Sequence, residues 1–152
     1  MVIRRAYTLV ELLVTIALLA LLAAFTVPTY QLILSQLQLN SAVGQVTDFI
    51  RLAAQKTVTE QQVYGVTLNA GSVNVVMYEM VNGVKTTVQT STLPTNMKID
   101  TVSFNNTSDI SFTTAGAPSV SGSFTVKDTI RNRSRLIQIR PSGNILDNQV
   151  EQ

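Results

Sequence analysis

Residues 4–28 read RRAYTLVELLVTIALLALLAAFTVP, which is two arginines followed by an apolar stretch with a single acidic side chain, Glu11. No further charged residue occurs before Asp48. The segment Leu12–Val27, counted together with the residues from Thr8, just spans a bilayer at about 1.5 Å per helical residue. Two arginines ahead of such a run favour a cytoplasmic N-terminus. The sequence therefore predicts a membrane-spanning helix near the N-terminus.

Two simple interpretations fit this segment. One is a secretory signal peptide, with the small residues Ala23 and Ala24 ahead of a cut, which makes the rest an exported soluble domain. The other is a plain membrane anchor or a buried core helix. Glu11 argues against both, because a carboxylate in an apolar membrane segment costs about 2–3 kcal/mol, less near the interface, and so needs a partner or a function.

Residues 6–11 read AYTLVE, with a small residue, an aromatic residue and a glutamate at fixed spacing. This stretch resembles the prepilin cleavage and methylation motif of type IV pilins and type II secretion pseudopilins. The resemblance extends to Pro28 and Tyr30, which fall where pilin helices commonly carry a proline and a tyrosine, and to a basic leader at residues 1–6. The family usually has glycine and phenylalanine at the first two motif positions, where this chain has alanine and tyrosine.

The resemblance implies that a prepilin peptidase cuts between Ala6 and Tyr7 and methylates the new amine of Tyr7. Glu11 would then pair with the terminal amine of a neighbouring subunit and set the axial register during assembly. Pro28 is the second residue that the resemblance assigns to assembly. The implied function is that of a structural subunit, a minor one, of a type II secretion pseudopilus or a type IV pilus.

The implied parts of the chain are a cleaved leader at 1–6, a transmembrane and filament-core half of the helix at 7–29, and a periplasmic head at 30–152. A single-pass subunit of this kind is held in the bacterial inner membrane, with its head in the periplasm or outside. Its partners are other pilin or pseudopilin subunits, the prepilin peptidase and the membrane. No cofactor is expected.

After Pro28 the apolar residues form a stripe at spacings of three and four, which predicts one face of a helix that lies on a sheet. Its members are Leu34, Leu37, Val43, Val46, Phe49, Ile50 and Ala53. Pro28 and Gly44 are expected to bend or loosen this helix, which should continue to about Val58.

The remainder alternates as strands, with turn residues at Asn69–Gly71 and at Asn82–Gly83 that predict a meander of the first three. The predicted strands are Val63–Leu68, Val73–Tyr78, Val84–Thr90, Met97–Phe104, Ile110–Thr113, Ser123–Val126 and Leu136–Arg140. The expected fold is α+β and pilin-like, a long N-terminal helix packed on an antiparallel β-sheet head.

Two further stretches carry a narrower resemblance. Residues 51–68 read RLAAQKTVTEQQVYGVTL and residues 135–145 read RLIQIRPSGNI. They resemble the GspH/FimT type of minor pseudopilin, in which a helix end runs into the first strand and an arginine-started strand ends near a glycine.

Composition excludes several kinds of chemistry. The chain has no cysteine and no histidine, so a Ser-His-Asp triad, a thiol nucleophile and an ordinary zinc site are ruled out. No catalytic pair of carboxylates is recognisable, and no enzymatic activity is expected. Of 11 basic and 9 acidic side chains, two arginines lie in the leader, so a chain cut after Ala6 has no net side-chain charge.

The basic residues of the head gather late in the chain, at Arg131, Arg133, Arg135 and Arg140, with Lys127 nearby. They either contact DNA phosphates, as in minor pilins that serve natural transformation, or belong to a solvated loop and strand edge. No aromatic residue is interleaved with them for base stacking.

The C-terminal residues Asp147, Asn148 and Glu151 offer oxygen ligands for calcium or form a frayed polar tail. The tail is the favoured interpretation, and no metal site is predicted.

Overall fold

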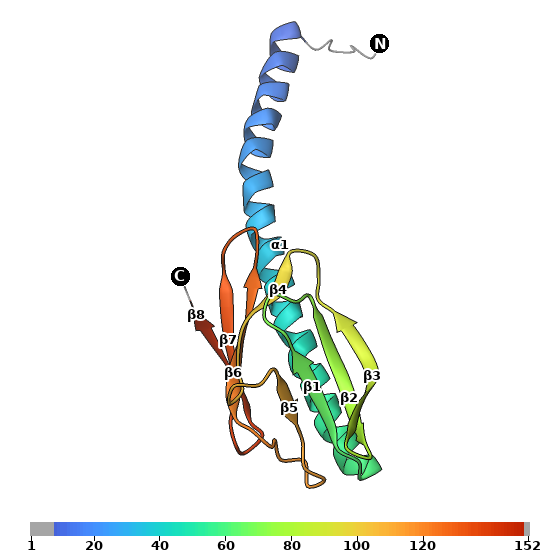
Figure 1. Ribbon diagram of the computed structural model, residues 1–152. Coiled ribbons are helices and arrows are strands. Elements are labelled where there is room, and N and C mark those ends of the chain that lie inside the picture. Colours follow the sequence, from blue (N-terminus) through green and yellow to red (C-terminus); the bar gives the residue numbers. More distant parts are fainter. Residues whose placement is uncertain (1–7, 151–152) are drawn as a thin grey trace. The chain divides into compact units, whose positions relative to one another are not determined.

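The computed structural model describes residues 8–150, apart from the side chains of Val27, Pro28, Gln149 and Val150. The elements are α1 (Leu9–Glu60), β1 (Tyr64–Leu68), β2 (Asn74–Val81), β3 (Val84–Thr92), β4 (Met97–Ser103), β5 (Asp109–Ser111), β6 (Gly122–Asp128), β7 (Ser134–Ile139) and β8 (Ile145–Val150) (Figure 1).

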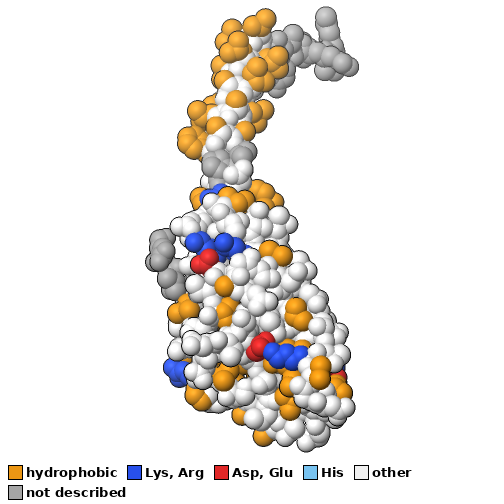
Figure 2. Space-filling view, in the orientation of Figure 1, with side chains coloured by type: hydrophobic (Ala, Val, Ile, Leu, Met, Phe, Trp, Pro, Cys, Tyr) orange, Lys and Arg blue, Asp and Glu red, His pale blue; other side chains and the backbone are white. Residues whose placement is uncertain are grey.

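The chain divides into an N-terminal unit, Met1–Gln36, and a C-terminal unit, Leu37–Gln152. Hydrophobic side chains dominate the surface of the described part of the N-terminal unit, whereas the surface of the C-terminal unit is mixed (Figure 2). The predicted long helix is confirmed, because α1 runs through both units as one element.

The C-terminal end of α1 is fixed to the first strand by a buried threonine. The Thr57 hydroxyl donates to the carbonyl of Ala53 at 2.9 Å and accepts the N–H of Tyr64 at 3.2 Å. Gln61, with φ of 55°, adopts the left-handed conformation that commonly ends helices. The chain therefore turns directly from the helix into β1.

Two antiparallel sheets form the rest of the C-terminal unit, with strand orders β3-β2-β1-β5 and β4-β6-β7-β8. The predicted meander of the first three strands is confirmed. Asn82 and Gly83, with φ of 52° and 78°, form the turn between β2 and β3, as a two-residue hairpin requires. Seven of the strands were expected, with bounds that differ by a few residues.

The prediction of a frayed tail is wrong, because residues 145–150 form an eighth strand. β8 pairs with β7 along its whole length, from Ser134↔Val150 to Ile139↔Ile145. The turn between them contains Gly143 at φ 81°. Asp147 and Asn148, in the middle of β8, are residue types depleted in strands, so their conformation comes from backbone pairing and cross-strand contacts more than from intrinsic strand propensity. Glu151 lies outside the described residues.

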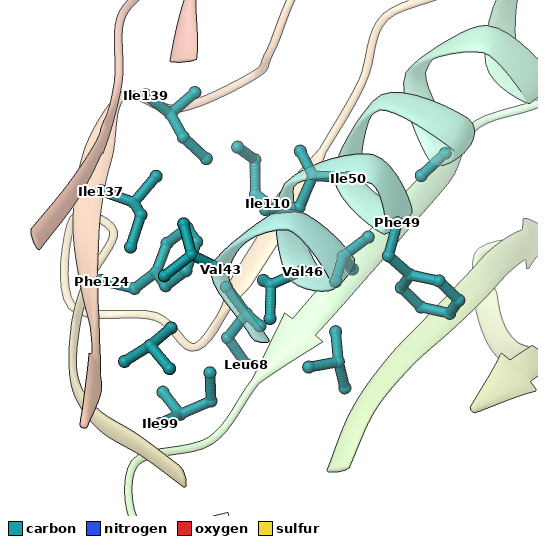
Figure 3. Close-up of a cluster of buried hydrophobic side chains, with 14 of the residues drawn as sticks. Val43, Val46, Phe49, Ile50, Leu68, Ile99, Ile110, Phe124, Ile137 and Ile139 are labelled. Carbon is teal, nitrogen blue, oxygen red and sulfur yellow. The ribbon is translucent and has the colours of Figure 1, made fainter. Parts of the chain in front are cut away.

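One face of α1 fills the core between the two sheets (Figure 3). The predicted stripe is confirmed at Val43, Val46, Phe49, Ile50 and Ala53, which are all buried. It is wrong at Leu34 and Leu37, which are 39% and 58% exposed. The buried apolar face begins instead at Leu39 and Ala42. Helical spacing alone does not reveal where the covering sheets begin.

Across the core, sheet residues from both sides meet this face of the helix. Figure 3 shows Leu68 on one side and Phe124, Ile137 and Ile139 on the other. The Phe104 and Phe124 rings pack with centroids 6.4 Å apart.

The absence of a side chain at Gly122 allows β6 to approach the backbone of Ser103 and Phe104 closely. A Cβ atom at Gly122 would lie 2.1 Å from the carbonyl oxygen of Ser103 and 2.5 Å from Cδ1 of Phe104. Only glycine fits this position without a shift of the backbone.

Candidate functional site

The described side chains of the N-terminal unit up to Tyr30 are exposed. An 18-residue window of α1 has a mean hydropathy of 2.5, and none of it is buried within the structure. By length and composition, α1 is the one helix among the described residues that could cross a membrane. Such a surface needs lipid or other apolar helices around it.

The first turn of α1 has a capping arrangement that involves Glu11. The Thr8 hydroxyl accepts the N–H of Glu11 at 3.2 Å, and the Thr8 carbonyl accepts the N–H of Leu12 at 3.2 Å. Threonine followed three residues later by glutamate is the spacing of a capping box, and a carboxylate in the first turn also interacts favourably with the helix dipole. This spacing can be read from the sequence. It gives Glu11 a role at the start of the helix, which the free-energy cost of a carboxylate in a membrane does not indicate. The predicted cleavage site between Ala6 and Tyr7 lies outside the described residues.

Pro28 lies inside α1, whose helical backbone continues through it. A proline has no N–H, so one carbonyl in the preceding turn has no helical donor. Threonine hydroxyls on either side donate to carbonyls one turn back, Thr26 to Leu22 at 2.8 Å and Thr29 to Phe25 at 3.0 Å. These bonds satisfy the hydroxyl groups within an otherwise apolar stretch.

The four arginines of the predicted basic cluster fall in three places. Arg131 and Arg133 lie in the loop between β6 and β7, Arg135 lies within β7, and Arg140 follows the end of that strand. Since a strand rises about 3.3 Å per residue, Arg140 lies roughly 20 Å along the sheet from the loop. The described residues therefore do not bring all four arginines into one patch.

Arg135 is held in an ion pair. Its Nε donates to Oδ1 of Asp147 at 3.0 Å, Nη2 contacts the other carboxylate oxygen, and Nη1 donates to Oδ1 of Asn40 at 2.5 Å. The Arg135 side chain is only 14% exposed. Bidentate pairing to a carboxylate fixes both position and orientation of a guanidinium group. Arg135 thus connects β7 with β8 and with α1.

The loop that carries Arg131 and Arg133 is built on a buried carboxylate. Asp128 is 2% exposed, and its Oδ1 accepts the N–H groups of Ile130 at 2.9 Å and Arg131 at 3.3 Å. The Asp128 N–H donates to the Arg133 carbonyl at 2.8 Å, and the N–H of Asn132 donates to the Asp128 carbonyl at 3.0 Å. This tight turn leaves Ile130 70% exposed.

Sheet register adds a cation that the sequence pattern does not reveal. Lys98 on β4 stands opposite Lys127 on β6, on the face away from the buried Ile99 and Val126. The Lys98 Nζ lies 3.9 Å from Oδ1 of Asp100. Like charges directly opposite each other in a sheet are destabilising, so this pair has a structural cost. Its proximity follows from strand order, which no local spacing predicts.

Comparisons with known proteins give a motif and a fold. Residues 1–27 match the model of the prokaryotic N-terminal methylation motif. No curated protein matches the chain in sequence. The minor pseudopilin EpsH from the type 2 secretion system of Vibrio cholerae has a similar structure, with a TM-score of 0.60 and 8% identity over 74% of this chain and 97% of that one. The type IV minor pilin FimU of Pseudomonas aeruginosa PAO1 gives a TM-score of 0.57 and 13% identity over 72% and 92% of the two chains.

This chain has a pilin-like fold. The expected resemblance is confirmed for the N-terminal motif and for the structural neighbours, which include a minor pseudopilin and a minor pilin. In this pilin-like chain the motif match ends at residue 27, within α1, and the same helix continues to Glu60 in the core of the C-terminal unit.

Proposed function

We propose that this chain is a minor subunit of a type II secretion pseudopilus or a type IV pilus, assembled through its N-terminal helix. One observation supports this proposal above others. A methylation motif over residues 1–27 leads, without a break in the helix, into a C-terminal unit with the fold of minor pseudopilins. The role of such a subunit is mechanical and templating.

Processing is the first part of the proposal. A prepilin peptidase cuts between Ala6 and Tyr7 and methylates the amine of Tyr7. Mass spectrometry of the mature N-terminus tests both steps at once, since one mass reports the cut and the methyl group. A mature chain that begins at a methylated Tyr7 supports the proposal. A chain that begins near Phe25 indicates ordinary secretion of a soluble domain and contradicts it.

The location follows from the same processing. Before assembly the subunit spans the inner membrane once, with the C-terminal unit in the periplasm, and after assembly its apolar helix packs among those of other subunits. The exposed side chains of Leu9 to Phe25 then exchange lipid contacts for contacts with neighbouring helices, in a filament core.

Glu11 sets the register of assembly in this proposal. Its carboxylate pairs with the terminal amine of a neighbouring subunit, and the neutralised pair tolerates an apolar surrounding that a lone carboxylate does not. The bond of the Glu11 N–H to Thr8 is a backbone bond that survives substitution, but alanine removes both the carboxylate that pairs and its favourable interaction with the helix dipole.

Two substitutions separate these roles. Glutamine at N3 keeps the hydrogen-bonding capacity of a capping box but has no charge, so Glu11→Gln retains that capacity and loses the pairing and the dipole interaction. We expect both Glu11→Ala and Glu11→Gln to insert in the membrane and to fail to enter filaments, measured by fractionation of membranes and sheared filaments. Normal incorporation of Glu11→Gln would reject the charge pairing and leave only the cap.

DNA binding by a minor pilin in natural transformation remains the alternative prediction. Arg135 is engaged by Asp147 and Asn40, and Arg140 lies at the other end of β7, so the test of this alternative changes Arg131 and Arg133, which share one loop. Its test is to compare DNA retention at low salt between the unmodified chain and an Arg131→Gln, Arg133→Gln variant. Unchanged retention removes this alternative.

A further inference from the structure

The loop between β6 and β7 lies at the end of the C-terminal unit where α1 enters it (Figure 1). Two contacts place it there. Arg135, just after the loop, bonds to Asn40 near the start of the unit at Leu37. The N–H of Thr129 donates to the carbonyl of Asn96 at 2.8 Å, which brings the start of β4 to the same end. We call this end the entry end.

Among the residues that the structure describes, positive charge is in surplus at the entry end. Lys98 and Lys127 form the opposed pair on the outer face of the sheet, and Arg131 and Arg133 follow in the adjacent loop. The carboxylates among these groups are Asp100, which lies beside Lys98, and Asp128, which is buried in the turn, so within residues 8–150 four cations face two anions. The ion pair of Arg135 and Asp147 adds no net charge.

An exposed apolar side chain, that of Ile130, lies among these basic residues. Ile130 is 70% exposed, and its position at the turn is fixed by the bond of its N–H to Asp128 at 2.9 Å. A buried carboxylate holds the loop in shape, so the exposure of Ile130 belongs to an ordered turn. Basic residues around an exposed apolar residue suit binding at the membrane interface. There, attraction to anionic headgroups and burial of the apolar side chain both contribute to the binding free energy.

The covalent chain keeps the entry end close to a membrane that holds the N-terminal helix. The motif match and the apolar run end at residue 27, and the C-terminal unit begins ten residues later at Leu37. Ten residues of helix extend about 15 Å. The interfacial layer on each side of the hydrocarbon core is about 5–8 Å thick. The length of this ten-residue helical connection is therefore comparable to one Debye length, the distance over which anionic lipids attract basic groups.

We propose that the entry surface, formed by Lys98, Lys127, Ile130, Arg131 and Arg133, binds anionic phospholipid headgroups while the subunit is still anchored in the membrane. This inference depends on the proposed membrane anchoring. The contact holds the C-terminal unit against the bilayer before assembly and has to be released when the subunit enters a filament. Nucleic acid fits the surface less well, because no aromatic side chain among these residues offers a base a stacking partner and an exposed isoleucine contributes nothing to phosphate binding.

The lack of cysteine allows a direct measurement with single labels. The full chain carrying Ile130→Cys is labelled with a fluorophore and reconstituted in phosphatidylcholine vesicles, with or without phosphatidylglycerol and with a trace of lipid bearing a nitroxide on its headgroup. Val84→Cys is the matched control. Val84 is also an exposed apolar residue, at 65%, and it directly follows the turn between β2 and β3. Met80, just before that turn, donates its N–H to the carbonyl of Val63, so the turn lies near the C-terminal end of α1 and away from the entry end.

We expect strong quenching at position 130 that requires phosphatidylglycerol and decreases with added salt, and weak quenching at position 84 under all conditions. Each cation near an anionic surface contributes about a fivefold factor in affinity, so Lys98→Gln should reduce the ratio of bound to unbound C-terminal units about fivefold. Adding Lys127→Gln and Arg131→Gln should abolish the quenching. The salt and lipid dependence needs no substitution of a charged residue, so a folding defect in these variants leaves the test intact.

Three outcomes overturn the inference. Equal quenching at positions 130 and 84, or quenching at 130 that is insensitive to lipid charge and salt, excludes a headgroup contact. Unchanged quenching in the triple variant, together with lost retention of DNA, assigns the surface to nucleic acid. Flotation of the protein with vesicles at high salt separately reports anchoring by α1, so failure of the anchor is distinguished from failure of the entry surface to bind.

Discussion

Replacing Arg135 with glutamine should destabilise the C-terminal unit, because the arginine connects β7 to Asp147 on β8 and to Asn40 on α1. Two limits bracket the expected loss in the free energy of unfolding. Hydrogen bonds to charged groups contribute about 1.5–3 kcal/mol when buried, and exposed ion pairs contribute about 0.2–1 kcal/mol. With side-chain exposures of 14% for Arg135 and 37% for Asp147, an intermediate loss of about 1–2 kcal/mol is expected. At about 4 °C per kcal/mol for a chain of this length, the melting midpoint should fall by about 4–8 °C.

The assay is thermal unfolding of the full chain in detergent, followed by circular dichroism in the β-sheet region. Arg140→Gln is the matched control, since it removes the same charge from an exposed side chain just beyond the same strand. A double-mutant cycle with Asp147→Asn isolates the pair, and a coupling of about 1 kcal/mol is expected. If Arg135→Gln and Arg140→Gln lower the midpoint equally and the coupling is zero, the ion pair has no structural role.

Three further predictions concern the same unfolding assay. Gly44→Ala should stabilise the protein by about 0.5–1 kcal/mol, because a helical Cβ at this position meets nothing within 4 Å; a lower midpoint would indicate that flexibility at Gly44 is needed. Gly122→Ala should cost about 3 kcal/mol or more, because the new Cβ would lie 2.1 Å from a backbone carbonyl oxygen; a cost below 1 kcal/mol would contradict the close packing there. The hydrogen bond to Glu60, with burial, raises the pKa of Tyr64 to about 12, and burial raises the pKa of Tyr78 to about 12. Since the unfolded chain then loses phenolic protons first, the contribution of these two tyrosines to stability should be constant below about pH 10 and decline from there toward pH 12, measured as melting midpoint against pH; a midpoint that is independent of pH above 10 would contradict both shifts.

The helix and most strands were predictable because their signals are local. The charge-free N-terminal run, the stripe from Val43 to Ala53 and the Asn82–Gly83 turn each depend on neighbouring residues, and the structure confirms them. Strand β8 was not predictable in this way. Residues such as Asp147 and Asn148 do not favour strands, and they adopt one because β7 supplies the hydrogen bonds.

The sites show the same division. The capping box of Thr8 and Glu11 is a local spacing and can be read from the sequence. Arg140 is separated from Arg131 because β7 is extended between them, and Lys98 approaches Lys127 because β4 and β6 are neighbours in the second sheet. A run of arginines close in sequence therefore predicts a single patch only if the chain does not form an extended strand between them.

The position of Leu39 as the first buried apolar residue of α1 has a practical consequence. A polypeptide that begins at Leu37 keeps every buried apolar side chain of the core and lacks the exposed apolar helix that requires detergent. Cutting the helix a few turns later, at Ile50, would remove Leu39, Ala42, Val43, Val46 and Phe49 from the interior and leave both sheets with an open face. A water-soluble form for crystallisation or NMR is thus best started in the narrow interval just before Leu39.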